Sequence, residues 1–378
     1  MIYLDHAATT PLDLSVEELM RPFGREVYGN PSSAHGAGRR ARFAIDEARD
    51  RVADQLNARA AEIIFTSGGT EADNLALFGV ARAMRTRGQH IITTAIEHHA
   101  VLSSCAALER EGFQVSYLRP AGDGLLAPAQ VEAAITPQTI LVSVSYANNE
   151  VGVVQPIAKI GCLCRERKVL FHSDAVQAAG ELSLSVQELQ VDLLSLSAHK
   201  IYGPKGVGAL YVRAGTRMQP VCYGGGQEHE RRAGTENVAG IIGLACALER
   251  AQDPTEISRQ RQLREMLIEG VLAISGSRLH GNRIQRLAGN VNIGFAGVPG
   301  ETLQLALDLE GIACSTGAAC AAGAATPSHV LMAMGYTRTQ AQEALRLTLG
   351  RGTTSEEIRQ TIATLTTLVS GLRKRGAS

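Results

Sequence analysis

The sequence predicts an α/β protein, with a mostly parallel sheet in a large domain and a second, smaller α/β domain. Short apolar segments alternate along the chain with segments of helical periodicity, which is typical of a parallel sheet covered by helices on both faces. The chain has 378 residues, 45% of them hydrophobic, and can therefore bury one large and one small core.

The expected elements follow from local patterns. Ile45, Ala48, Val52 and Leu56 recur at helical spacing, and Pro156 suits the first turn of a later helix. Helices are also expected at about 70–88, 101–111 and 355–371 and near 301 and 338. Apolar, β-rich segments predict strands at 62–66, 90–95, 114–118, 139–146, 169–173, 192–197, 208–212 and 290–295.

A polar stretch between two helices, near 251–256, marks the expected domain boundary. We therefore expect a large domain at residues 14–252. Residues 1–13 and 253–378 are expected to form the small domain.

Composition excludes several functions. The 37 basic and 37 acidic residues balance, whereas a nucleic-acid or anionic-membrane surface needs a basic excess. The N-terminus lacks signal-peptide features and the longest apolar stretch, about 238–248, is too short to span a bilayer, so cytoplasm is expected. The seven cysteines are scattered without a CxxC pair, which predicts neither disulfides nor a metal site, and Cys105, Cys222 and Cys246 are expected to be buried.

Gly68-Gly69-Thr70 stands between a predicted strand and a predicted helix. Glycines let the backbone approach an anion closely, and the free N–H groups and helix dipole favour negative charge there. On its own the motif also fits an ordinary tight turn with a capping threonine, which is the commoner case.

Lys200 follows an apolar strand, where a lysine is unusual. Ser197 and His199 are suitable phosphate donors, and with the glycine turn they suggest a phosphorylated aldehyde beside Lys200. Asp174 ends another strand and could keep a pyridinium nitrogen protonated, with Gln177 donating to a phenolic oxygen. The alternatives are a solvated loop lysine and a helix-capping aspartate.

These segments resemble the cysteine desulfurases, the NifS/IscS branch of the class V aminotransferase-like family. The resemblance implies a PLP-dependent transferase fold of the aspartate-aminotransferase type, with pyridoxal 5'-phosphate bound in the large domain. Matching segments cover nearly the whole chain in the family's order, at 3–10, 29–33, 65–74, 97–98, 148–152, 174–177, 197–200, 231–235, 315–320 and 346–351. His6 stands where the family usually has Asn, and no role is assigned to it.

The resemblance implies a role for each matching residue. Lys200 would carry the cofactor, Asp174 would pair with the ring nitrogen, and His98 would stack on the ring and relay protons. Of His98 and His99, only one can face the ring. Asn149 and Gln177 would contact the ring oxygen. The phosphate would be held by Gly69, Thr70, Ser197 and His199.

Two further implications concern the substrate and a partner subunit. Arg346 would bind the substrate carboxylate, which its planar fork suits, and Asn30 would assist. Thr235 would reach the phosphate of the other subunit, which implies a homodimer with shared sites.

Cys320 is the expected nucleophile. It ends the segment Ser315-Thr316-Gly317-Ala318-Ala319-Cys320, which fits the family's active-site motif except that Ala318 replaces the usual Ser. Small residues predict a mobile loop at about 314–326. Cys314 is the competing nucleophile, but it follows an apolar strand-like segment and is expected to be buried beneath the site.

The expected reaction takes sulfur from L-cysteine, gives L-alanine and leaves a persulfide on Cys320. The persulfide would pass to an acceptor protein, such as an iron–sulfur scaffold, by thiol exchange. A selenocysteine lyase or another class V aminotransferase-like enzyme stays open as an alternative. A non-catalytic sulfur-carrier or assembly subunit is the alternative from another class.

Overall fold

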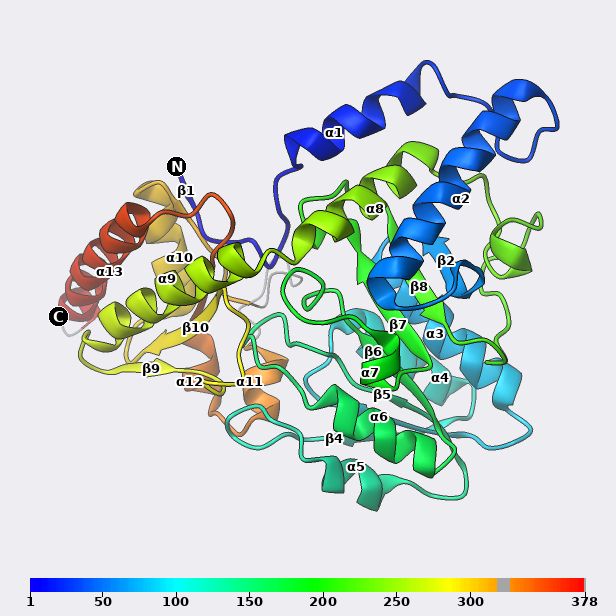
Figure 1. Cartoon of the computed structure of the whole chain (residues 1–378). Coiled ribbons are helices and arrows are strands. Elements are labelled where there is room, and N and C mark those ends of the chain that lie inside the picture. The colour runs from blue at the N-terminus through cyan, green and yellow to red at the C-terminus, as the bar shows by residue number, and fades with distance from the viewer. Residues whose placement is uncertain (318–326, 377–378) are drawn as a thin grey trace.

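The computed structural model describes residues 1–317 and 327–376. Figure 1 shows two parts, a larger one around a central sheet and a smaller one that contains both chain ends, with the run from α8 (Val238–Ala251) into α9 (Pro254–Leu272) passing from one to the other. The smaller part lies at one end of the large sheet.

The large sheet is mostly parallel, as the sequence predicts. Five adjacent strands pair in parallel, in the order β7, β6, β5, β3 and β4. Strand β8 is antiparallel to both of its neighbours, β2 and β7. The strand order is β2 (Ile63–Thr66), β8 (Gly208–Val212), β7 (Leu193–Ser197), β6 (Leu170–Asp174), β5 (Thr139–Ser143), β3 (His90–Thr94) and β4 (Gln114–Leu118). Each strand coincides with a predicted apolar segment to within a few residues.

Helices cover both faces of this sheet. One face carries α2 (Gly36–Leu56), α6 (Ile157–Glu166) and α8, and the other carries α3 (Gly69–Met84) and α4 (His99–Arg110). Strand side chains alternate between the faces, so that Phe171 of β6 joins the first core while its neighbour His172 faces α3. Shorter helices complete this part, namely α1 (Leu14–Met20), α5 (Pro128–Ala134) and α7 (Val186–Leu189).

The smaller part is built from both ends of the chain. Its sheet has the antiparallel order β12 (Ala344–Thr348), β10 (Asn290–Phe295) and β9 (Ser277–Leu279), and beside it β1 (Ile2–Tyr3) pairs in parallel with β11 (Ile312–Ala313). The helices of this part are α9, α10 (Gly300–Leu309), α11 (His329–Ala333), α12 (Arg338–Gln342) and α13 (Ser355–Gly376).

Long helices hold the smaller core together. Ile358, Leu365 and Val369 lie on one face of α13 and are fully buried, and α9 contributes Leu267 and Ile268 to the same core. Each such side chain contributes roughly 1.5–3 kcal/mol of transfer free energy. Because this core also contains Ile2 and Leu4 of the N-terminus, we propose that it marks a small domain of residues 1–13 and 253–378.

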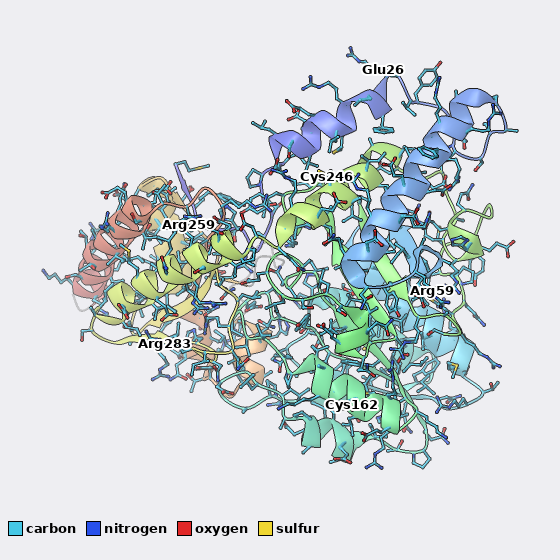
Figure 2. The ribbon with its side chains drawn as sticks, in the orientation of Figure 1. Glu26, Arg59, Cys162, Cys246, Arg259 and Arg283 are labelled. Atoms are coloured by element: carbon cyan, nitrogen blue, oxygen red, sulfur yellow. The ribbon has the colours of Figure 1, made fainter. Side chains whose placement is uncertain are left out.

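Four described cysteines are buried, namely Cys105, Cys164, Cys246 and Cys314. The expectation for Cys222 is wrong, because this residue is exposed in an irregular loop beside the glycines 224–226. Cys162 is also exposed, on the outer side of α6 (Figure 2). Among the described helices, none combines the length and the apolar character needed to cross a lipid bilayer.

Candidate active site

A cavity of about 290 Å³ lies at the carboxyl ends of the parallel strands, beside the smaller part of the chain. Loops that leave parallel strands converge at this end of a sheet, where ligands commonly bind. Ten of the predicted site residues line the cavity: Gly69, Thr70, His98, Asn149, Asp174, Gln177, Ser197, His199, Lys200 and Arg346. The fold therefore brings distant parts of the sequence to one place.

Lys200 lies directly after β7, at the end of the 3-10 turn Ala198–Lys200. Its Nζ donates to the carbonyl oxygens of Ala7 at 2.5 Å and of Ala8 at 2.7 Å. The N-terminal segment thus holds the amine at a defined place in the cavity wall. The amine is also close enough to Asp174 for the two charges to interact.

The turn between β2 and α3 is shaped to accept an anion. Gly68 has φ +149°, which favours glycine, and α3 begins at Gly69 with N–H groups that lack intrahelical partners. A Cβ atom on Gly69 would lie 2.7 Å from Val176 Cγ2 and 3.6 Å from Ser197 Cβ, so a larger residue would fill the cradle. With the Thr70 hydroxyl and the helix dipole, the cradle fits a phosphate group.

His199 lies beside this cradle as a neutral ring. Its Nδ1 is 3.1 Å from Thr9 Oγ1. Burial, together with the charges of Lys200 and Lys205, lowers the pKa of His199 to about 4. A bound phosphate would favour the protonated ring, because an anion stabilises a nearby cation.

Asp174, the last residue of β6, supplies a carboxyl group to the cavity. It is 8% exposed, and its Oδ1 accepts a hydrogen bond of 2.9 Å from the Val176 N–H. Burial raises the pKa of Asp174, while this hydrogen bond and the charges of His98 and Lys200 oppose the increase. A protonated heterocyclic nitrogen in the cavity would stabilise the carboxylate further.

A buried chain of polar side chains runs beneath Asp174, on the sheet face that α3 covers. His172 Nδ1 lies 2.9 Å from Ser143 Oγ, and its Nε2 lies 3.0 Å from Ser195 Oγ. Asp73, on α3, places Oδ1 3.6 Å from His172 Nε2, and this buried oxygen has no hydrogen-bond partner among the described residues. Burial lowers the pKa of His172 to about 3, and burial and the Asp174 charge raise that of Asp73. His172 is therefore neutral at pH 7, and the raised pKa of Asp73 favours its protonated form.

His98 caps the N-terminus of α4. Its Nδ1 accepts a hydrogen bond of 3.1 Å from the Ala100 N–H, so a neutral His98 carries its proton on Nε2. Burial lowers the pKa of His98. His99 also lines the cavity but is exposed, so His98 is the histidine that is more enclosed by the protein.

Arg346, in β12, reaches the cavity from the smaller part and is 3% exposed. Its Nη2 pairs with Asp5 Oδ1 at 2.8 Å, and its Nη1 donates to the Asn149 carbonyl at 2.9 Å. The Nε atom is buried without a hydrogen-bond partner among the described residues. Gln177 is held by the N-terminal segment, because its Nε2 donates to the Ala7 carbonyl oxygen at 3.0 Å.

Two described residues of the predicted site, Asn30 and Thr235, do not line this cavity, and a third, Cys320, is not among the described residues. Asn30 is exposed before α2, and its Oδ1 accepts a hydrogen bond of 2.9 Å from the Ser32 N–H. Thr235 is exposed before α8. Cys320 and residues 318–326 of the predicted loop lie outside the described residues. The roles of all three stay predictions.

Cys314 is placed as the sequence predicts, at the end of β11 and 7% exposed. Burial raises the pKa of its thiol to about 12. A nucleophilic cysteine must form a thiolate, so the structure disfavours Cys314 in that role.

Sequence reasoning missed Asp73, Glu150 and His329, which also line the cavity. One signal was present for Asp73, because a residue three positions after Thr70 on a helix lies on the same side. Glu150 follows Asn149 within a matching segment. His329 carried no local signal, since the packing of α11 alone brings it to the cavity.

The chain is similar to known proteins over nearly its whole length. The family model described as Aminotransferase class-V matches residues 2–361. Two curated relatives are named Cysteine desulfurase IscS. The one from Dictyoglomus turgidum is 49% identical, covering 98% of this chain and 95% of the relative. The one from Methanosarcina thermophila is 48% identical, covering 98% and 93%.

Solved structures give the same result. One named NifS-like protein has a TM-score of 0.92 and 38% identity, covering 98% of this chain and 99% of its own. Another, named SspA in complex with cysteine, has a TM-score of 0.83 and 37% identity, covering 92% and 99%. The chain therefore belongs to the class V aminotransferase family, in the NifS/IscS branch of the cysteine desulfurases.

Proposed function

We propose that this chain is a pyridoxal-phosphate-dependent cysteine desulfurase, which converts L-cysteine to L-alanine and leaves the sulfur as a persulfide on Cys320. The observation that carries the proposal is the single cavity in which an amine, a buried carboxyl group and an anion cradle meet, at Lys200, Asp174 and Gly69. Relatives named cysteine desulfurase match nearly the whole chain, and one related structure is named as a complex with cysteine.

The cavity residues suit the chemical groups of pyridoxal phosphate. The cradle at Gly69 suits its phosphate, the Asp174 carboxylate its ring nitrogen and the Lys200 amine its aldehyde. The flat imidazole of His98 suits the face of its ring. When bound, pyridoxal phosphate supplies an aldehyde that condenses with amines and an electron sink for the bonds next to that amine.

Lys200 is proposed to hold the cofactor and later to move a proton. With pyridoxal phosphate and cysteine bound, Lys200 Nζ would act as the base that takes the α proton of cysteine. Asp174 would support this step as an anion, because a negative charge there would keep a pyridinium nitrogen protonated. The negative charge is assigned to Asp174 because His172 is neutral and the raised pKa of Asp73 favours its protonated form.

Arg346 and His98 are proposed to orient the substrate. The Arg346 guanidinium can bind the carboxylate of cysteine, with Asp5 and the Asn149 carbonyl holding the side chain in place. His98 carries its proton on Nε2 in the neutral form and can pass it to the substrate.

Cys320 is proposed as the nucleophile in the sulfur transfer. A bond forms between the Cys320 sulfur and the substrate sulfur, and the carbon–sulfur bond of the substrate breaks. The electron pair of that bond goes to carbon, which takes up a proton and becomes the methyl group of alanine. A sulfur-acceptor protein, such as an iron–sulfur scaffold, is proposed to receive the persulfide sulfur by thiol exchange.

A homodimer is proposed because Thr235, which the resemblance assigns to the phosphate of a second subunit, is exposed outside the cavity of its own chain. Asn30 is likewise exposed and is proposed to assist substrate binding. We propose the cytoplasm as the location, because the six described cysteines are free thiols, which a reducing compartment favours.

The function is tested by incubating the purified protein with pyridoxal phosphate, L-cysteine and a reductant, without any keto acid. Alanine and sulfide should form in equal amounts. Lys200→Ala should lose the visible absorbance of lysine-linked cofactor, whereas Lys205→Ala, at an exposed position in the next loop, should retain it. A protein that binds no cofactor, or one that requires a keto acid, would contradict the proposal.

A further inference from the structure

His329 is the first residue of α11 and lines the cavity from the smaller part of the chain. Its Nε2 lies 3.0 Å from the backbone carbonyl oxygen of Glu97. A carbonyl oxygen only accepts hydrogen bonds, so Nε2 must carry a proton. The other nitrogen of the neutral ring, Nδ1, therefore carries a lone pair, which accepts no hydrogen bond from residues 1–317 or 327–376.

Glu150 is placed to stabilise a proton on that nitrogen. Its Oε1 lies 3.9 Å from His329 Nδ1, which is beyond hydrogen-bond distance of the neutral ring but within ion-pair distance of a protonated one. Glu150 is 2% exposed, and its Oε2 accepts a hydrogen bond of 2.5 Å from Ser328 Oγ. This bond holds the carboxylate beside the imidazole. A backbone carbonyl on one side and a carboxylate on the other is an arrangement that suits a general base.

The other titratable groups around His329 do not compete for this proton. The His99 ring lies 4.7 Å from the His329 ring, and burial and the His329 charge lower the pKa of His99. His98, further into the cavity, also has a lowered pKa. The carboxyl group of Glu97 turns away and bonds to Thr94 and to the Ser145 N–H.

The proposed reaction requires such a base. It involves two thiols, that of L-cysteine and that of Cys320, and a thiol of ordinary pKa near 8.5 is mostly protonated at pH 7. The mechanism above gives Lys200 the α proton and leaves the thiol proton without an acceptor. His329 and Gly317 both line the cavity.

We infer that His329 is the general base for a thiol in this cavity, with Glu150 as a positioning residue. The S–H bond breaks, an Nδ1–H bond forms and the electron pair remains on sulfur. This inference rests on the proposed function and deepens it by naming the group that makes the thiolate.

The first test compares His329→Gln with Met332→Gln. The glutamine amide at 329 can still donate to the Glu97 carbonyl but cannot act as a base, and Met332 lies on the same helix outside the cavity. We expect H329Q to lower kcat/KM for L-cysteine by about 10²- to 10⁴-fold at pH 7, and M332Q to retain it. The loss should shrink toward pH 9, where thiols ionise unaided, whereas a purely structural defect would persist.

Two further measurements identify the thiol. L-selenocysteine carries a selenol, which is more acidic than a thiol and ionised at neutral pH. If His329 serves the substrate, H329Q should keep its activity on selenocysteine. If His329 serves Cys320, alkylation of Cys320 by iodoacetamide should require a higher pH in H329Q. The exposed Cys162 on α6 (Figure 2) is an internal reference, and its alkylation profile should not change.

A loss that is equal at every pH and for both substrates, with unchanged alkylation of Cys320, would overturn the inference. Glu150→Gln gives a second measure, since it retains the shape but removes the charge. It should produce a smaller loss than H329Q at pH 7, and the double variant should lose no more than H329Q alone. Failure of the proposed function can be distinguished from failure of this inference. In the first case the wild-type protein would form no alanine from L-cysteine. The alkylation profiles can be measured in either case.

Discussion

Asp73 Oδ1 and His172 Nε2 lie 3.6 Å apart where Asp73 lines the cavity, and both groups are buried. Such a pair could hold one positive and one negative charge. The pKa shifts favour the neutral forms instead, since burial lowers the pKa of His172 to about 3 and raises the pKa of Asp73. Both shifts favour a neutral pair, in which Asp73 keeps its proton while Asp174 supplies the negative charge.

Asp73→Asn should leave the charge of the site unchanged, because an amide replaces a protonated carboxyl group. The infrared spectrum of the wild-type protein at pH 7 should contain a protonated carboxyl band that disappears in D73N. Asp308→Asn, at an exposed position on α10, should cause no such loss. If Asp73 were ionised in the wild-type protein, the spectrum of D73N would instead lack a carboxylate band.

Gly69→Ala should weaken binding of pyridoxal phosphate at least tenfold, because its Cβ would lie 2.7 Å from Val176 Cγ2 and fill the cradle. A titration of cofactor absorbance measures the effect. Gly36→Ala is the matched control, since it lies at the start of another helix, where a Cβ would meet only an arginine nitrogen at 3.9 Å. Equal affinity in G69A and the wild type would show that the phosphate binds elsewhere.

Cys320→Ala should abolish formation of alanine and sulfide from L-cysteine while the absorbance of bound cofactor remains. Cys314→Ala should keep turnover, because burial holds the pKa of the Cys314 thiol at about 12 and makes a thiolate unfavourable there. If C320A still released sulfide and C314A did not, the two assignments would have to be exchanged.

Glu97 should make the protein less stable as the pH rises from about 4.5 to 7. Burial raises the pKa of Glu97 from 4.5 to about 7. Between these pH values Glu97 is therefore protonated in a larger fraction of folded chains than of unfolded chains. Stability then falls with pH by at most about 1.4 kcal/mol per unit.

Glu97→Gln should flatten this part of the pH dependence, because the amide does not titrate. Urea denaturation of E97Q and the wild type at several pH values between 4.5 and 8 measures the difference. Parallel curves for the two proteins would mean that Glu97 is ionised at neutral pH in the folded state.

Much of the site could be predicted because its signals are local. Lys200 after an apolar strand, Asp174 at the end of another and the glycine turn at 68–69 each combine a residue type with a predicted element. The carboxyl ends of parallel strands meet at one edge, so the strand pattern already implied that Lys200 and Asp174 lie close together.

Other features depended on packing between distant segments. The Ala7 and Ala8 carbonyls that hold Lys200 come from the first residues of the chain, and Asp5 pairs with Arg346 across more than three hundred positions. Neither the periodicity of the sequence nor its motifs indicate that these residues lie close together. The exposure of Cys222 was mispredicted for the same reason, because hydrophobic character alone does not show whether a loop is covered.

By itself, the sequence determined the alternation of strands and helices, the mostly parallel sheet and the chemical types of the central residues, because each depends on spacing within a few positions. Tertiary structure alone decided that burial favours the neutral forms of Asp73 and His172 and that His329 meets Glu150 beside the cavity. The physical reason is that burial and charge pairing set proton positions, and both arise only when separate elements pack together.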